Sequence, residues 1–357
     1  MSEANRARQV PLDVLKLVCA QCIMLHHFSV YGPFAEAFAH AAPAVSDWLF
    51  DYGRMAVQVF LVLGGYLAAF SLERLACAGG LRWWMVVWRR YLRLVGPLLA
   101  ALLLVSAAAA LARLWLHDDF VPAAPTWAQW VSHAALLQDL LGMEALSVGV
   151  WYVAIDFQLY TLLAALIWLG VRFGQVHRLT QWLVAGLMGV SLFYANLRSD
   201  WDVGALYFFG VYGMGVVAFW AQQTPRRIHV LGGVTVVVGL ALVLAFRERL
   251  VLALLTFWVV GMRITWHPQA WSAGMRGWVT RLGDSSYGLF LTHFAVLLLI
   301  NTLVTQWGVR GATATWLMLL AGAALSTGLG LAFTRFVEQP LSSWTVARQS
   351  GHPPSEA

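Results

Sequence analysis

Residues 11–31 read PLDVLKLVCAQCIMLHHFSVY. The run is long enough to cross a bilayer, since about 20 apolar residues span the hydrocarbon core. Yet it contains Asp13, Lys16 and His27, and ionisable groups inside a membrane cost about 2.5–3.5 kcal/mol each on insertion scales. Lys16 and His27 are close to three helical turns apart, so they share one stripe, about 16 Å apart along the axis. The stripe indicates a functional helix face. The structural alternative is a snorkelling Lys16 and a His27 hydrogen-bonded to a neighbouring span.

The composition assigns the whole chain to the membrane. Of its 357 residues, 60% are hydrophobic and 11% are charged, whereas a soluble domain has about 25% charged residues. The net charge of +6 does not predict nucleic-acid binding, because the basic residues fall in short loops between apolar runs. Three cysteines are too few for a disulfide framework or a thiolate metal site, and the polar start of the chain lacks the apolar core of a signal peptide. We therefore expect an all-α polytopic membrane protein without a metal.

The distribution of basic residues sets the predicted topology. We expect ten transmembrane helices at about 12–31, 55–72, 94–112, 148–171, 181–197, 203–221, 228–246, 250–266, 285–304 and 312–337. With both termini in the cytoplasm, 17 of the 23 Lys and Arg residues lie inside, which is the expected bias. If the apolar segment 127–146 crossed the membrane, the orientation of every later span would be reversed and the bias of basic residues would be lost. We therefore interpret it as an amphipathic helix in the outer leaflet. One membrane domain, 1–345, and a polar cytoplasmic tail, 346–357, are expected, in a bacterial inner membrane.

Several polar residues fall inside or beside the expected spans. In 88-WRRYLRLVGPLL-99, the basic residues Arg89, Arg90 and Arg93 either anchor the helix by the positive-inside bias or form a guanidinium fork for phosphates. Arg90 and Arg93 lie three apart, on one helix face. In 53-GRMAVQVFLVLGGYLAAF-70, the Gly64-Gly65 pair predicts close packing against a neighbouring helix.

Acidic and histidine residues in later spans have structural and functional interpretations. In 151-WYVAIDFQLYTLL-163, Asp156 shares a face with Tyr160, and Trp151 shares another with Gln158. A buried acid needs a partner such as Lys16 or a histidine. In 283-GDSSYGLFLTHFAVL-297, Ser286 and His293 face the same way, and Asp284 or Ser285 is the expected N-cap. In 335-RFVEQPL-341, Glu338 could pair with Arg335, and Pro340 is expected to end the helix.

Taken together, these segments resemble the acyltransferase 3 family of integral-membrane acyltransferases, nearly end to end. The carrying blocks are 12-LDVLK-16 followed by ten residues and His27, 57-VQVFLVLGGYL-67, Arg89-Arg90 with Arg93 and Pro97, 151-WYVAIDFQLY-160, 286-SYGLFLTH-293 and 337-VEQP-340. Lys16 stands where the family has Arg, Gly64 where it has Ser, and Asp156 where it has Glu. We expect this protein, unlike two-domain members of the family, to be a single-domain member without a second, esterase-like domain after the last span.

The resemblance implies O-acylation. An acyl group, with acetyl as the expected case, would move from cytoplasmic acyl-CoA to a hydroxyl of a cell-envelope or exported carbohydrate or glycolipid. His27 would be the general base or a transient acyl carrier, and Lys16 would polarise the thioester carbonyl or anchor an acid. Glu338 would position the donor or form an ion pair, and no cofactor would be permanently bound. Donor phosphates would meet Arg89, Arg90 and Arg93. The expected supporting polar residues are Asp13, Trp151, Asp156, Gln158, Tyr160, Ser286, Tyr287 and His293.

A transporter is the competing class of function. Lys16, His27, Asp156 and His293 would equally suit a proton relay within the membrane. The sequence contains neither an inverted-repeat signal nor a matched pair of interrupted helices, which such a transporter would be expected to show. We therefore favour the enzyme.

Overall fold

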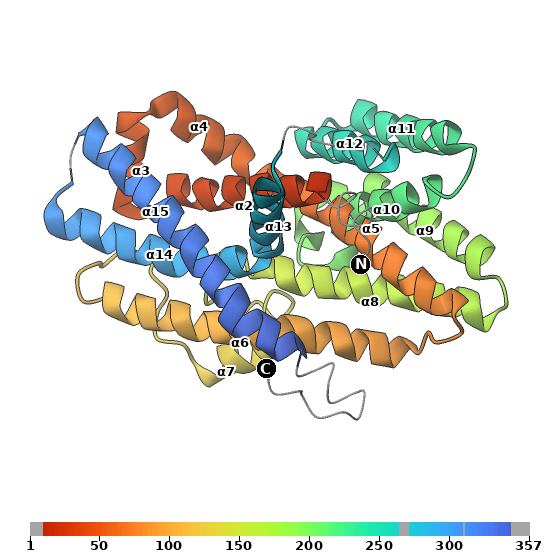
Figure 1. The fold of residues 1–357 in the computed structure, drawn as a ribbon, viewed down its shortest axis with the longest axis horizontal. Coiled ribbons are helices and arrows are strands. Elements are labelled where there is room, and N and C mark those ends of the chain that lie inside the picture. Colours follow the sequence, from red (N-terminus) through yellow and green to blue (C-terminus); the bar gives the residue numbers. More distant parts are fainter. Residues whose placement is uncertain (1–9, 264–270, 310, 344–357) are drawn as a thin grey trace. The chain divides into compact units, whose positions relative to one another are not determined.

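The computed structural model describes residues 10–263, 271–309 and 311–343, and within these ranges the chain forms helices and turns without a strand (Figure 1). The prediction of an all-α fold is confirmed. The polar start before residue 10 and the predicted tail 346–357 lie outside the described residues. The described chain groups into two compact units: Met1–Ala56 with Leu92–Trp151 and His267–Ala357, and Val57–Tyr91 with Tyr152–Trp266. The single domain 1–345 stays a prediction.

The first unit contains the two ends of the described chain. Its elements are α2 (Val10–Val30), α3 (Gly32–Ala41), α4 (Pro43–Tyr52), the 3₁₀ turn η1 (Gly53–Met55), α7 (Trp127–Ala134), α13 (Ala273–Asp284), α14 (Ser286–Trp307), α15 (Ala312–Phe333) and the π-helical turn η4 (Thr334–Glu338). The later part of α6 (Trp83–Ala112), from Leu92 onward, also belongs to this unit.

The second unit contains the earlier part of α6 and the middle of the chain. Its elements are α5 (Ala56–Cys77), α8 (Trp151–Arg172), α9 (Val176–Phe193), the 3₁₀ turns η2 (Ala195–Leu197) and η3 (Ser199–Trp201), α10 (Ala205–Ala221), α11 (Arg227–Leu244) and α12 (Glu248–Gly261). Helix α10 packs on α9 and α12.

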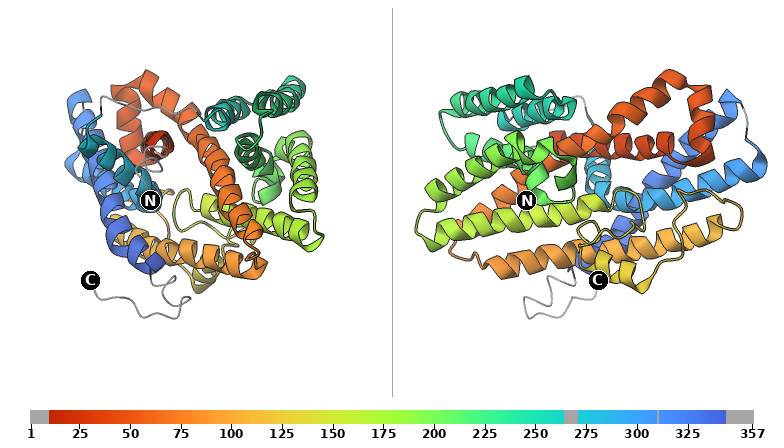
Figure 2. Two further views of the ribbon diagram at one scale, coloured as in Figure 1. Left: turned by 45° about the vertical axis from the view of Figure 1, so that its right-hand side comes forward. Right: turned by 180° about the vertical axis from the view of Figure 1, so that it is seen from behind.

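Glycines set the helix spacing in the first unit. Helices α14 and α15 lie side by side (Figures 1 and 2). A Cβ on Gly330 of α15 would come within 2.7 Å of the backbone of Leu289 in α14. In the same way, a Cβ on Gly283 of α13 would meet the Asp13 side chain of α2 at 2.8 Å. Small residues let helix backbones approach closely where no hydrophobic drive exists between helices. The first unit is thus a tight packing of α2, α13, α14 and α15.

The predicted close contact at Gly64-Gly65 is confirmed in the second unit. A Cβ on Gly65 of α5 would lie 2.0 Å from the carbonyl oxygen of Tyr212 in α10. Reciprocally, a Cβ on Gly215 of α10 would lie 1.9 Å from the carbonyl oxygen of Val62 in α5. The two helices therefore cross backbone to backbone, which no side chain larger than hydrogen permits.

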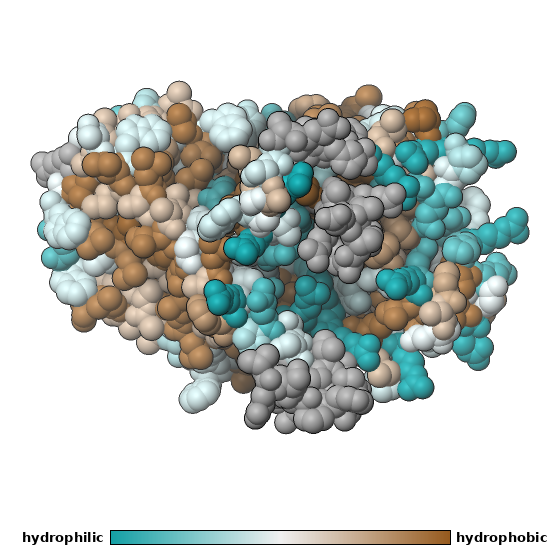
Figure 3. Space-filling model, viewed as in Figure 1, coloured by the Kyte–Doolittle hydropathy of each residue, from teal (hydrophilic) through white to brown (hydrophobic). Residues whose placement is uncertain are grey.

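The expected spans correspond to helices, with differences in length. Within the described residues, seven helices are long and apolar enough to cross a membrane. The expected spans at 181–197, 203–221 and 250–266 are α9, α10 and α12, with 18, 17 and 14 residues, somewhat shorter than the roughly 20 residues that cross a bilayer. The count of ten spans and the cytoplasmic placement of both termini stay predictions. Figure 3 shows broad apolar surface over α14 and α15, where Leu317, Leu320 and Leu325 are exposed, as lipid contact requires.

Two boundaries differ in ways that matter for the site. Helix α6 begins at Trp83, eleven residues before the predicted start of its span, so Arg89, Arg90 and Arg93 lie within the helix. Segment 127–146 is helical only over Trp127–Ala134. Turns follow from Ala135 to Gly142, with Leu136 at φ 57° and Gly142 at φ 62°. An eleventh span through this segment is excluded, because left-handed residues do not continue an α-helix.

Candidate active site

Two histidines meet inside the first unit. His27 lies near the end of α2 and His293 near the start of α14. Nδ1 of His27 is 2.7 Å from Nε2 of His293, and the two rings are within 10° of parallel. His27 is 9% exposed and His293 is 1% exposed. Two buried imidazoles in hydrogen-bonding contact, far apart in sequence, are the most distinctive polar feature of this unit.

The surroundings of the pair are asymmetric. Nδ1 of His293 lies 3.1 Å from the carbonyl oxygen of Leu289, one turn back in α14. His27 forms no second side-chain hydrogen bond to any described residue. No carboxylate in the described chain forms an ion pair with either ring. The bond from His293 to Leu289 therefore fixes the orientation of the pair, while Nε2 of His27 has no hydrogen-bond partner among the described residues.

Gly149 approaches the open side of His27. It has φ +80°, and a Cβ there would come 3.0 Å from the Phe290 ring and 3.7 Å from Cε1 of His27. Glycine adopts this left-handed conformation without strain and lets backbone come close to another group. Gly149 was not among the residues predicted from the sequence. It falls inside the expected span 148–171, whereas α8 begins two residues later, at Trp151, and a single glycine near a helix start is also typical of an ordinary loop.

His26 points elsewhere. Its Nδ1 lies 2.8 Å from the carbonyl oxygen of Leu49 in α4, and Ser29 donates to the His26 carbonyl. Successive residues of a helix are about 100° apart, so only one of two adjacent histidines can face α14. His26 thus links α2 to α4.

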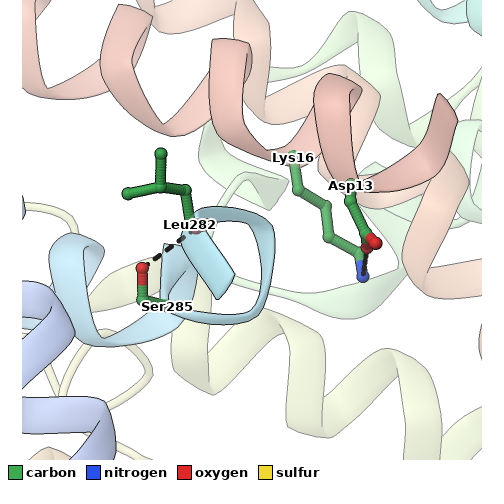
Figure 4. Close-up of polar contacts among 4 residues, drawn as sticks. All are labelled: Asp13, Lys16, Leu282 and Ser285. Carbon is green, nitrogen blue, oxygen red and sulfur yellow. Dashed lines mark hydrogen bonds and ion pairs between the residues drawn. The ribbon is translucent and has the colours of Figure 1, made fainter. Parts of the chain in front are cut away.

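The predicted polar stripe of α2 is divided between two neighbouring helices. Lys16 Nζ lies 3.3 Å from Asp13 Oδ1 (Figure 4). Asp13 is buried against α13, where Gly283 makes room for it. Lys16 keeps 24% of its side chain exposed and is bonded to Asp13, with no hydrogen bond to His27. The two predicted catalytic residues of α2 therefore lie at separate depths, about 16 Å apart along the axis.

Ser285 occupies the expected N-cap position of α14, but its side chain does not cap the helix. Its hydroxyl donates instead to the carbonyl of Leu282 in α13 (Figure 4). Tyr287 is also among the expected polar residues, and its hydroxyl donates a hydrogen bond to the carbonyl of Leu94 at 3.1 Å. This bond joins the start of α14 to α6, three residues before Pro97. Ser286 begins α14.

Glu338 lies in the π-helical turn η4. Its carboxylate accepts a hydrogen bond from Thr334 at 3.1 Å, and Arg93 of α6 attracts it electrostatically. The anticipated pairing with Arg335 is absent from the described ion pairs, and the Arg335 guanidinium lies over the Phe336 ring. The prediction that Pro340 ends the helix is wrong: helix continues over residues 339–343. The wider π turn just before it accommodates a residue without an N–H.

In the second unit, Arg90 and Asp156 form an ion pair in which Asp156 is buried and the Arg90 side chain is 26% exposed. The Arg90 guanidinium also lies 5.1 Å from the Tyr160 ring centroid. A Cβ on Gly64 would come 3.4 Å from Tyr212 and 3.7 Å from Asp156. The partner of the buried acid is thus an arginine of α6 rather than Lys16 or a histidine.

The remaining expected polar residues have structural contacts or positions. Gln158 Oε1 accepts from the backbone N–H of Ala205 at 3.0 Å, which satisfies a free N–H at the start of α10. Trp151 is the first residue of α8. Arg89 and Arg93 are exposed. In the described part of the chain, no three His, Cys, Asp or Glu side chains gather in a way that could hold a metal ion.

Comparison with known proteins gives one finding. A family model described as an acyltransferase domain matches residues 10–335, nearly the whole chain. No curated protein and no solved structure matches the sequence or the fold. The matched region contains the histidine pair and the Arg90–Asp156 ion pair, and it ends just before Glu338.

Proposed function

Because the chain belongs to this acyltransferase family, and is an acyltransferase of the membrane that acts on hydroxyl groups, we propose that it transfers an acyl group from acyl-CoA to a carbohydrate of the cell envelope. The carrying observation is the buried contact of His27 with His293 at 2.7 Å. A histidine whose second nitrogen meets no partner among the described residues suits a general base. Acetyl-CoA is the proposed donor, and a bacterial inner membrane is the proposed location.

The proposed chemistry is a single displacement at the thioester carbonyl. Nε2 of His27 takes the proton of the acceptor hydroxyl while the hydroxyl oxygen forms a bond to the carbonyl carbon of the thioester. The bond between that carbon and the thioester sulfur then breaks, and the proton on His27 passes to the departing thiolate. The products are an O-acyl ester and free CoA, and His27 is neutral again. General base catalysis of this kind contributes about 10²–10⁴-fold to the rate.

Arginine residues of α6 are the proposed donor contacts. Guanidinium groups bind phosphates through paired N–H donors, and Arg89 and Arg93 are exposed and therefore available to the nucleotide part of CoA. Arg90 is already neutralised by Asp156, so we assign it to holding this stretch of α6 in place. Glu338, attracted by Arg93, would set the position of that arginine. Lys16 donates to Asp13 and lies about 16 Å along the helix axis from His27, so of its two expected roles we keep that of holding an acid.

The test combines the product with a catalytically impaired variant. Envelope glycans from cells with the gene, without it, and complemented with His27→Gln should be compared by mass spectrometry at matched protein levels. We expect acylated hydroxyls only with the wild-type gene, and purified wild-type protein in nanodiscs should release CoA only when the acceptor is present. Identical glycans in all three strains, together with substrate movement across sealed vesicles without acyl-CoA, would support a transporter instead.

A further inference from the structure

The histidine pair fixes where its protons lie. A backbone carbonyl can only accept, so the 3.1 Å contact with Leu289 requires a proton on Nδ1 of His293. In a neutral imidazole the other nitrogen is then an acceptor. Nε2 of His293 must therefore accept the hydrogen bond at 2.7 Å, and Nδ1 of His27 must donate it. The proton of a neutral His27 is thus on Nδ1, and Nε2 has a free lone pair.

The neighbourhood favours the neutral state in both rings. Each is buried, and neither forms an ion pair with a carboxylate of the described chain. The other titratable groups beside His27 are His26, with ring centroids 5.4 Å apart, and Tyr31, at 5.8 Å. Neither is an acid that would hold an imidazolium. Burial without a counter-charge disfavours a charged imidazole.

We propose that His293 is a positioning residue that holds His27 in the Nδ1–H tautomer, so that Nε2 of His27 is the atom that takes the acceptor's proton. The inference rests on the proposed role of His27 as the base. Leu289 is the fixed end of the chain of bonds, because a carbonyl in a helix cannot change its hydrogen-bonding direction. Gly149 lies beside Cε1 of His27, the carbon bonded to both ring nitrogens.

The arrangement also stabilises the charge that forms during transfer. When Nε2 of His27 takes a proton, the ring becomes an imidazolium, and its Nδ1–H donates to His293 as a charge-assisted hydrogen bond. Such bonds are roughly twice as strong as neutral ones. The gain exists only while the proton is on His27, so it favours the transition state over the resting enzyme.

The first experiment compares His293→Leu with His293→Gln. Leucine removes the acceptor for Nδ1–H, whereas the glutamine Oε1 can accept in nearly the same place as the imidazole Nε2. We expect His293→Leu to lower kcat by about 10- to 100-fold, the range found for partners that orient metal-binding histidines, with KM little changed. His293→Gln should recover most of the loss, and His293→Glu should move the acidic limb of the pH–rate profile to higher pH. A residue needed only for packing would not give this order.

The second experiment reads the tautomer without turnover. Solid-state NMR of the ¹⁵N-histidine-labelled protein in bilayers distinguishes protonated from unprotonated ring nitrogens, and the His27 signals are identified by their absence in His27→Gln. We expect a protonated Nδ1 and an unprotonated Nε2. If the wild-type protein transfers no acyl group, the proposed function fails; if His27→Gln keeps the wild-type activity, the role of His27 as the base fails whatever the tautomer. If His27→Gln is inactive but the proton lies on Nε2, or His293→Leu and His293→Gln behave alike, the positioning role fails alone.

Discussion

Two buried histidines of the first unit, His27 and His133, have the same tautomer, with the proton on Nδ1, but lie in different surroundings. His133 of α7 donates from Nδ1 to the carbonyl of Gln129 at 2.8 Å, and its Nε2 accepts from the backbone N–H of Leu146 at 3.2 Å. His27 donates from Nδ1 to His293, and its Nε2 has no partner among the described residues. Both rings are therefore Nδ1–H tautomers, and they differ only in what the second nitrogen meets.

The difference separates a structural histidine from a chemical one. With both nitrogens used by backbone, His133 fastens the turn after α7 to Leu146 and has no lone pair left for a reaction. His27 has one bond for orientation and one nitrogen left over, which is what a base requires. Burial alone does not distinguish the two. The free lone pair does.

The largest effect should follow from removing the free lone pair. His27→Ala should lower acyl transfer by about 10²–10⁴-fold with little loss of folded protein, because the proton of the hydroxyl loses its acceptor. His26→Ala, which removes the bond to Leu49 and the ring beside His27 but leaves the bond between His27 and His293, is the matched control. Both are measured at equal protein levels in an acyl-CoA-dependent assay. Equal losses in the two variants would contradict the distinction.

The ion pair in the second unit should behave as structure rather than chemistry. Asp156→Leu leaves the partly buried Arg90 without its counter-charge, and the cost should approach the roughly 3–5 kcal/mol of a fully buried pair. We expect a strong fall in membrane abundance and thermal stability, measured by fluorescence-detected size-exclusion chromatography after heating. The double variant Arg90→Leu, Asp156→Leu should recover much of it, since no lone charge remains. Arg89→Leu, at an exposed neighbour, is the control, and a loss there as large as in Asp156→Leu would refute the ion-pair explanation.

Adding a side chain at Gly149, beside His27, should have an intermediate effect on kcat/KM. Gly149→Ala places a Cβ 3.0 Å from Phe290 and 3.7 Å from His27, so we expect kcat/KM to fall by about 10- to 100-fold, since displacements of about 1 Å at a reacting group can cost that much. Gly142→Ala carries similar backbone strain at φ +62° with nothing within 4 Å of the new Cβ. Steady-state kinetics of the two variants separates strain from obstruction. Similar kinetics in both would mean that only strain matters.

The smallest effect concerns the pH dependence of stability at His133. Burial lowers the pKa of His133 from its ordinary value, despite the opposing influence of its bond to the Gln129 carbonyl. The unfolded chain therefore binds a proton near pH 6.5 that the folded chain does not. The contribution of His133 to the free energy of unfolding should be fully present above this pH and should decline as the pH falls through it.

The measurement is the melting temperature between pH 8 and pH 5. His133→Leu should be less stable at every pH, because the Leu146 N–H loses its acceptor, and should show a flatter dependence on pH. An unchanged slope would show that His133 does not supply the proton uptake.

The sequence predicted the class of fold and the presence of polar residues in its interior, but few of their partners. Apolar runs and the charges within them identify a helical membrane protein with His27, Asp156 and His293 in its interior. The contact between His27 and His293 joins residues 266 positions apart, and helical periodicity describes only one helix at a time. Likewise, the need of Asp156 for a partner followed from burial, while the identity of that partner as Arg90 depended on helix packing.

Other differences have local causes. Helix α6 starts at Trp83 because an amphipathic turn rich in Trp and Arg precedes the apolar run, and hydropathy detects only the run. Segment 127–146 has helical composition but contains Leu136 at φ 57°, a left-handed conformation that no rule for leucine anticipates. Gly149 gave no periodic signal at all.

The crossing of α5 and α10 has a mechanical consequence. Backbone of each helix lies where the other would place a Cβ, at Gly65 and Gly215, so neither helix can rotate or slide without its main chain striking its neighbour. The two helices can therefore move together as one rigid body, but they cannot bend or slide against each other where they cross. Any movement that admits or releases a substrate must therefore come from elements other than this joint.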